Sequence, residues 1–135
     1  MHLRKKIAVF IVALGLAVGG IQTLAHHAFS AEFDAERPVH LEGTVIKVEW
    51  INPHAWVHLR VTKDDDSTED WMVEGGTPNV LARRGVNRNS LQIGTVIIID
   101  GYQAKDGTMK ANGRDLILQD GTKLFLGSSG TGAPE

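Results

Sequence analysis

Apolar and polar side chains alternate strictly in AWVHLRV, residues 55–61, and this period constrains the fold more than any other feature of the chain. Successive side chains of a strand point to opposite faces, so one set must face a core. The inward set is Ala55, Val57, Leu59 and Val61, and the outward set is Trp56, His58 and Arg60. The acidic run KDDDSTED that follows is typical of a hairpin loop, and WMVEG is the returning strand. On that strand we expect Trp71 and Val73 to face inward and Asp70, Met72 and Glu74 to face outward.

Strand patterns also precede and follow this hairpin. From Val39 to Trp50 the sequence is rich in β-branched residues, and it contains Gly43 where a bulge or sharp bend would be placed. GTVIIIDGYQ has the composition of a buried strand, and GRDLILQ is its hairpin partner across the Asp-Gly turn at 106–107. A second Asp-Gly turn at 120–121 leads to KLFLG.

A short helix is predicted between the two hairpins, in GGTPNVLARRG. Thr77 can cap it, Pro78 suits its first position and Gly85 supplies a left-handed end. Three strands, one helix and two strands is the order of the five-stranded OB-like Greek-key barrel. We therefore predict an all-β fold with one short helix, arranged as this barrel; a small open sandwich of the same strands is the alternative.

The N-terminus has the order of a secretory signal peptide. Basic residues at 4–6 precede an apolar run from Ile7 to Val18, and Thr23 and Ala25 are small enough for positions −3 and −1 of a cleavage site. An uncleaved anchor is the alternative, but the run is interrupted by glycines and is shorter than the roughly 20 apolar residues of a span. We expect cleavage after Ala25 and a periplasmic or secreted protein, with membrane contact only through the signal peptide.

The remaining chain is predicted to form one domain: an N-terminal segment over 26–38, the barrel over 39–127 and a flexible tail over 128–135. Removing residues 1–25 takes away three of the 14 Lys and Arg and none of the 16 Asp and Glu, which leaves a formal charge of −5. That charge argues against nucleic acid as a partner. The absence of cysteine excludes disulfides, zinc-thiolate sites and cysteine catalysis.

Two adjacent histidines would begin the mature protein. With His26 at the terminus, its α-amine and ring nitrogen could chelate one metal ion together, and His27 could add a ligand. An α-amine, whose usual pKa is about 7.7–8, releases its proton to a metal near neutral pH. All-nitrogen sites of this kind suit copper(II). The alternative is that the two histidines lie on a flexible terminus without a role.

A second candidate site lies on the outward face of the first hairpin, where His54, Trp56 and His58 alternate with core residues. Met72 or Glu74 would lie beside His58, depending on a register that the sequence leaves open. Imidazole, thioether and indole groups together indicate a soft-metal or aromatic-stacking site. In the alternative interpretation, Trp56 packs under the N-terminal segment against Phe29 and Phe33, and the histidines end the strands.

Catalysis is not indicated. No serine has a nucleophile-elbow context, and the acidic hairpin loop lacks the ligand spacing of a calcium loop. His40 has no predicted role. We therefore expect a protein that is not an enzyme.

Several segments are specific enough to show a resemblance: HHAFSAEFD, EGTVIKVEWINPHAWVHL, VEGGTPNVLARRG, GYQAKDGTMKANGRDLIL and DGTKLFLGSSGTGAP. Together they resemble a domain-of-unknown-function family of small secreted bacterial proteins. The resemblance spans nearly all of the mature chain and implies no particular activity, substrate or cofactor.

Two functions remain in view. The first is a periplasmic carrier or binding protein for a metal, with copper predicted; His26, His27, His54 and His58 are the candidate ligands, and Trp56 and Met72 complete the site. In residue types it is similar to small periplasmic copper chaperones built on the same barrel. The second is an envelope protein-interaction or structural module that holds no metal and docks through Trp56.

Overall fold

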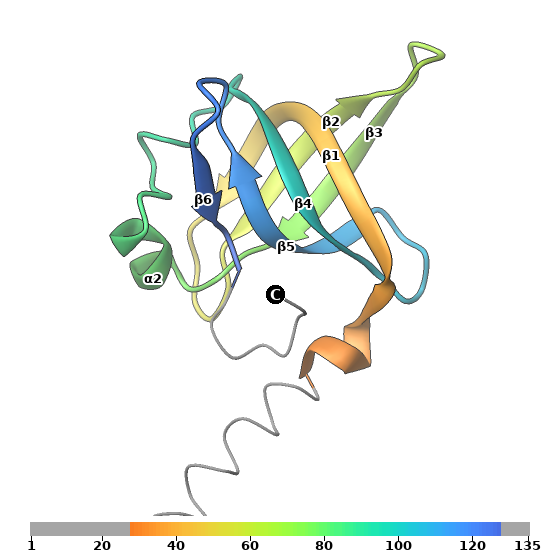
Figure 1. Ribbon diagram of the computed structural model, residues 1–135, viewed down its shortest axis with the longest axis horizontal. Coiled ribbons are helices and arrows are strands. Elements are labelled where there is room, and N and C mark those ends of the chain that lie inside the picture. Colours follow the sequence, from red (N-terminus) through yellow and green to blue (C-terminus); the bar gives the residue numbers. More distant parts are fainter. Residues whose placement is uncertain (1–27, 128–135) are drawn as a thin grey trace, which may run out of the picture.

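The computed structural model describes residues 28–127 of the chain, and His26 and His27 lie outside the described residues. The fold is mostly β (Figure 1). Its strands are β1 (Phe33–Glu49), β2 (Trp56–Thr62), β3 (Thr68–Glu74), β4 (Val96–Ala104), β5 (Lys110–Ile117) and β6 (Lys123–Phe125). Two short helices accompany them: residues 28–32 immediately before β1, and α2 (Pro78–Arg83) between β3 and β4.

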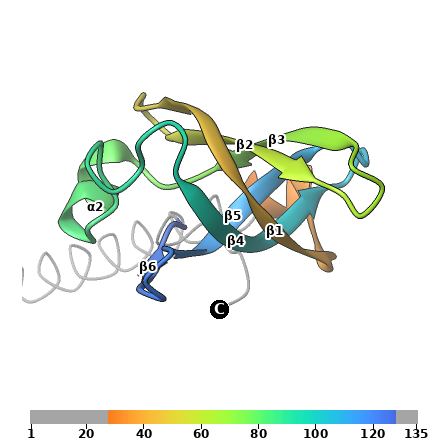
Figure 2. The ribbon, with the colours of Figure 1, turned by 90° about the horizontal axis from the view of Figure 1, so that it is seen from above.

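The six strands form one sheet in the order β3-β2-β1-β4-β5-β6, and neighbours in this order are antiparallel. In addition β3 pairs with β5 in parallel, from Met72 opposite Lys110 to Glu74 opposite Asn112. Figure 2 shows the resulting curvature, with β2 and β3 passing over β4 and β5. The prediction of five strands and one helix missed β6 and the helix at 28–32. Both are too short for a repeating pattern of apolar and polar residues to indicate them.

β1 begins at Phe33, six residues before the strand start predicted at Val39. The extension pairs with β4, Phe33 opposite Ala104 and Pro38 opposite Tyr102, with an irregularity between the two pairs. FDAERP has no alternating pattern, so only the tertiary pairing with β4 makes it a strand. Part of the segment predicted to precede the sheet therefore belongs to it.

Gly43 is needed for a close approach rather than for a bulge. A Cβ added at Gly43 would lie 2.7 Å from the carbonyl oxygen of Arg60 on β2. The register irregularity between β1 and β2 falls instead between Val45 and Lys47. The prediction of a bulge at Gly43 was therefore wrong in its position by a few residues.

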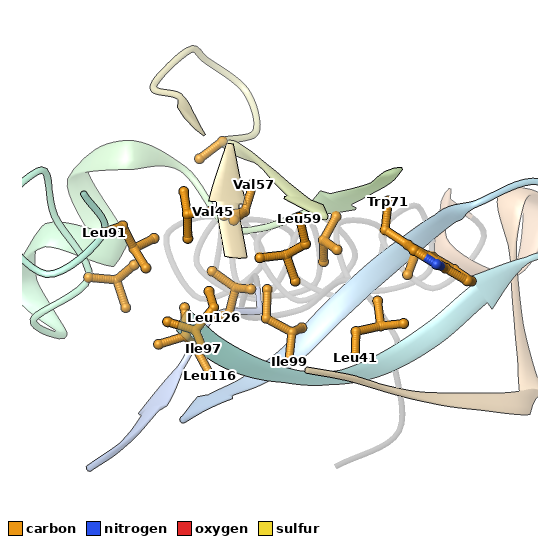
Figure 3. Packing of buried hydrophobic residues seen from close by; sticks show 14 of the residues in the cluster. Leu41, Val45, Val57, Leu59, Trp71, Leu91, Ile97, Ile99, Leu116 and Leu126 are labelled. Atoms are coloured by element: carbon orange, nitrogen blue, oxygen red, sulfur yellow. The ribbon is translucent and has the colours of Figure 1, made fainter. Parts of the chain in front are cut away.

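The predicted inward face of the first hairpin is confirmed in the core. Ala55, Val57, Leu59 and Val73 are at most 1% exposed, and Trp71 is 8% exposed. Val61, close to the loop that joins β2 and β3, is only half-buried. Figure 3 shows the side chains of β2 and β3 facing Ile97, Ile99 and Leu116 of β4 and β5 across the core.

A second, smaller cluster attaches the N-terminal helix to the sheet. Phe29 stacks on Phe33 with their ring centroids 5.9 Å apart, and meets Tyr102 of β4 edge-on at 5.7 Å. Ala104 completes the cluster, which is separate from the main core. The aromatic groups therefore hold residues 28–32 against the end of β4.

The predicted start and end of α2 are confirmed, but the predicted capping by Thr77 is not. Thr77 occupies the N-cap position and Pro78 the first turn, but the Thr77 side chain makes no capping hydrogen bond. Gly85 follows the helix with φ of +88°, as predicted for a left-handed end. Across residues 28–127, no helix has the length and apolar character to cross a membrane.

Candidate functional site

The register of the first hairpin brings the outward candidates side by side. Met72 of β3 lies opposite His58 of β2, and Glu74 lies opposite Trp56. Directly opposed residues share a face, so His58 and Met72 are neighbours on the outer surface. This is one of the two arrangements that the sequence left open.

Trp56 is covered by a cation and not by the aromatic residues proposed for that role. The Lys110 ammonium lies 5.1 Å from the centre of the Trp56 ring and 6.0 Å from the centre of the Phe33 ring. Lys110 is also ion-paired with Glu32 of the N-terminal helix. Phe29 packs on Phe33 and Tyr102 instead, so the N-terminal helix reaches Trp56 through the Glu32–Lys110 pair.

His54 lies in a pocket of about 160 Å³ between this helix and the sheet. The pocket is lined by Ala28, Phe29, Glu32, Phe33, His54, Glu74 and Asn112. His54 Nδ1 is 3.2 Å from the carbonyl oxygen of Gly75 and 3.6 Å from Oε1 of Glu74. A carbonyl oxygen only accepts, so Nδ1 carries the hydrogen and donates it. In the neutral ring Nε2 then keeps its lone pair, as in a metal-binding imidazole oriented by a carbonyl.

His58 is oriented by a different group. Its Nε2 is 2.7 Å from Oε2 of Glu49, and Lys47 lies 2.9 Å from the other oxygen of the same carboxylate. The hydrogen bond from His58, followed by that from Lys47, lowers the pKa of Glu49. Because the carboxylate accepts from Nε2, Nδ1 of His58 is the nitrogen available to a ligand.

Glu74 differs most from its prediction. It shares the outward face, yet it is only 8% exposed, because the N-terminal helix and β5 cover that end of β3. Burial raises the pKa of its carboxyl above the ordinary value of 4.5, and Glu32 adds to the rise; His54 and Lys110 oppose it, as does a hydrogen bond from Asn112. A buried carboxyl beside an imidazole is therefore the central polar feature of the pocket.

Replacing Glu74 by Gln in metal-free protein should give a stability difference that changes with pH. The folded pKa of Glu74 lies above its unfolded value, so the folded state of the wild type binds the extra proton and loses stability as pH rises from about 4.5 through the raised pKa. Glu74→Gln keeps the neutral form throughout. Its unfolding midpoint, measured by urea titration in chelator, should therefore rise relative to the wild type across that window.

Glu69→Gln is the matched control for this measurement. Hydrogen bonds from Lys63, and then from Trp71, lower the pKa of Glu69, so its contribution is present at higher pH and lost on acidification. The difference in unfolding midpoint between Glu69→Gln and the wild type should therefore change with pH in the opposite direction. If Glu74→Gln follows the same slope as Glu69→Gln, pairing with His54 outweighs burial at Glu74.

The two histidines of the hairpin do not form one centre. His54 pairs with Gly75 and Glu74, whereas His58 pairs with Glu49. Within residues 28–127, no group of three or more His, Asp or Glu side chains is placed so as to hold a metal ion. Sequence reasoning did not identify Glu49, Glu32 or Lys110 as neighbours of the candidates, because their proximity follows from strand register and from the docking of the N-terminal helix.

The fold and the pocket define a small sheet protein that presents a histidine and a buried carboxyl beneath its N-terminal helix. A family model described as a family of unknown function, DUF6152, matches residues 13–113. The chain belongs to this family. No curated protein and no solved structure is significantly similar to it.

Proposed function

We propose that the protein is an exported, non-enzymatic copper-binding protein, with its signal peptide removed after Ala25 and its strands arranged as an OB-like Greek-key barrel. The barrel assignment is supported by the pairings of β1 with both β2 and β4, and by the parallel pairing of β3 with β5. Together these link β1 to β5 in a ring, and α2 bridges β3 and β4 as it does in such barrels.

One observation carries the metal site: Ala28 and His54 line the same pocket. His27 is bonded to Ala28, and covalent geometry keeps His26 within roughly 7 Å of the Ala28 Cα. With cleavage after Ala25, the first residue of the mature protein would be two residues from the wall of this pocket. The α-amine and ring of His26, together with Nε2 of His54, supply nitrogen ligands that favour copper(II).

The surroundings suit a cation at this place. Glu74 lies 3.6 Å from His54 and provides a carboxyl whose negative charge a bound metal would stabilise. Glu32 lines the same pocket. The described residues thus offer a preoriented imidazole and the carboxyl of Glu74, while Glu32 is paired with Lys110. The terminal histidines complete the proposed ligand set.

A competitive copper(II) titration of the exported protein tests this assignment, with mass spectrometry to establish the N-terminal residue. We expect one equivalent bound by protein that begins at His26. His54→Ala should weaken binding by about 10-fold or more, the effect of losing one well-placed ligand or its support. An alanine inserted before His26 should weaken it similarly, because the chelating amine moves away from the ring.

His40→Ala is the matched control. His40 pairs with a carboxylate as His54 does, with Nδ1 2.6 Å from Oδ1 of Asp100, but it lines a different pocket. Its replacement should leave copper affinity unchanged. Unchanged affinity in both His54→Ala and the N-terminal insertion would overturn the proposal.

His58 and Met72 remain candidate ligands, as an imidazole and a thioether on adjacent strands. Loss of the bound copper in His58→Ala but not in His54→Ala would move the site to that face. Exported protein without metal affinity beyond that of a short peptide, and with a partner lost on Trp56→Ala, would support the interaction module instead.

A further inference from the structure

A second concave site lies at the end of the sheet that carries α2, away from the candidate copper pocket. It has a volume of about 530 Å³ and lies between the end of β1 and the segment from α2 to the following loop. Its walls are Trp50, Pro78, Asn79, Ala82, Val86, Asn87, Arg88 and Asn89. Figures 1 and 2 both place α2 and its loop at the opposite end of the sheet from the acidic β2–β3 loop.

The charge of this end contrasts with that of the rest of the chain. Residues 75–99 contain Arg83, Arg84 and Arg88 and no Asp or Glu, and the loop at 50–55 also lacks acidic residues. The formal net charge of the whole chain is −2. Of these arginines, Arg88 lines the pocket, and no Asp or Glu does, so the pocket wall favours an anionic ligand.

Arg88 is placed to contact such a ligand. Within residues 28–127 its guanidinium has no carboxylate partner, and its Cζ lies 5.8 Å from the centre of the Trp50 ring. By contrast, Arg60 is held by both oxygens of Asp70, and Arg84 is bound to the carbonyl oxygen of Gly127. The charge of Arg88 is thus available at the pocket wall.

The loop that carries Arg88 is rigidly built. Oδ1 of Asn87 accepts hydrogen bonds from the backbone N–H groups of Asn89 and Ser90, at 2.9 and 3.2 Å. The Ser90 hydroxyl donates to the carbonyl oxygen of Gly85 at 2.8 Å. These bonds fix the backbone on both sides of Arg88, so a ligand would not have to order the loop.

From these features we propose that this pocket binds an anionic saccharide, a sugar ring that bears a carboxylate or a phosphate. Trp50, half-buried and with Arg88 over its ring, offers its exposed edge to the C–H groups of the sugar, and Arg88 offers a guanidinium to the anionic group. Asn79 and Asn89, both exposed at the wall, offer amides to the hydroxyl groups. The site is separate from the copper pocket, and the inference does not depend on it.

A polynucleotide fits these features less well. Single-stranded nucleic acid is bound by several stacked aromatic side chains along a positive groove, whereas Trp50 is the single aromatic residue in the wall of this pocket. A compact pocket with one aromatic residue and one available guanidinium matches one or two sugar units.

Two-dimensional ¹H–¹⁵N NMR of the exported protein can test the site, because the chain has only three tryptophans and so gives three indole signals. Trp50→Phe assigns the signal of Trp50. The probes are a disaccharide of glucuronic acid and N-acetylglucosamine, the neutral disaccharide N,N′-diacetylchitobiose, and inorganic phosphate. We expect the acidic disaccharide to shift the Trp50 signal in a saturable manner, and to bind at least about 5-fold more tightly than either other probe, since a charge-assisted hydrogen bond is added.

Arg88→Gln should weaken binding of the acidic disaccharide by about 5-fold or more and leave the neutral probe unaffected. Arg60→Gln, which removes an exposed arginine from the other end of the sheet, should have no effect. Absence of a saturable shift, equal binding of phosphate or of the neutral disaccharide, or indifference to Arg88→Gln would each overturn the proposal. Tighter binding of a thymidine oligonucleotide or of phosphatidylglycerol vesicles to the same residues would overturn the saccharide proposal and identify the ligand as a nucleic acid or a lipid surface.

Discussion

At the proposed copper site, Phe29→Ala is expected to reduce copper affinity by about 10-fold or more, toward that of a free peptide with the same N-terminus, because it detaches residues 28–32 from the sheet. Phe29 is 5% exposed and is packed between Phe33 and Tyr102. It follows Ala28 directly, on the wall of the His54 pocket. Among the described residues, no other aromatic contact involves a residue so near to His26 and His27 in the sequence.

The main core should survive this replacement, because the Phe29 cluster is separate from it. The loss is then local: residues 28–32 should exchange amide hydrogens faster and be cut more readily by protease, while β2 and β3 stay protected. Competitive copper titration gives the affinity. Phe125→Ala removes a ring that is 39% exposed on β6 and should change neither result. Phe29→Ala with wild-type affinity and a released N-terminus would show that anchoring contributes nothing to binding.

Gly101→Ala is expected to destabilise the fold by about 3 kcal/mol or more, at the upper end of single replacements. A Cβ at this position of β4 would lie 2.2 Å from the carbonyl oxygen of Asn112 on β5. The oxygen is a backbone atom and the Cβ is fixed directly to the backbone, both in paired strands, so neither can turn aside as the end of a longer side chain would. Against a typical total of about 5–15 kcal/mol for a domain, this is a large fraction. Urea unfolding followed by tryptophan fluorescence measures it.

Gly94→Ala is the control that measures the cost of an unfavourable backbone conformation without a steric clash. Gly94 has φ of +89° and open space where a Cβ would be placed. Its replacement should therefore cost only the left-handed conformation, about 1–2 kcal/mol. If Gly101→Ala proves too unstable to purify, pulse proteolysis of freshly made protein should still rank the two variants. A Gly101→Ala protein as stable as Gly94→Ala would mean that β4 and β5 separate there without loss.

The alternating sequence of the first hairpin predicted its structure well. Ala55, Val57 and Leu59 are buried as the period of two requires, and Met72 faces outward beside His58. The helix at 78–83 was predicted from its proline and glycine signals. These features depend on residues close together in the chain, so local chemistry is enough to specify them.

Of the candidate site, the sequence predicted only that His54 and His58 share the outward side of the first hairpin. Glu74 was assigned to an outward face by its period; the sequence left open whether the N-terminal segment covers this face and did not indicate that Glu74 would be buried. The ion pair of Lys110 with Glu32 joins residues 78 positions apart, and its proximity to Trp56 depends on the parallel pairing of β3 with β5. Pairings at that separation leave no mark in a local pattern.

By itself, the sequence determined where the five longer strands and the turns lie and which face of the first hairpin is buried, because side-chain alternation and the glycine and proline positions act over a few residues. The tertiary structure alone decided that Phe33 begins β1, that the N-terminal helix covers Glu74, and that Arg88 comes to Trp50. Each of these depends on a contact between distant segments. Such contacts can form only after the strands have paired, because the space that the aromatic ring or the ion pair occupies does not exist before then.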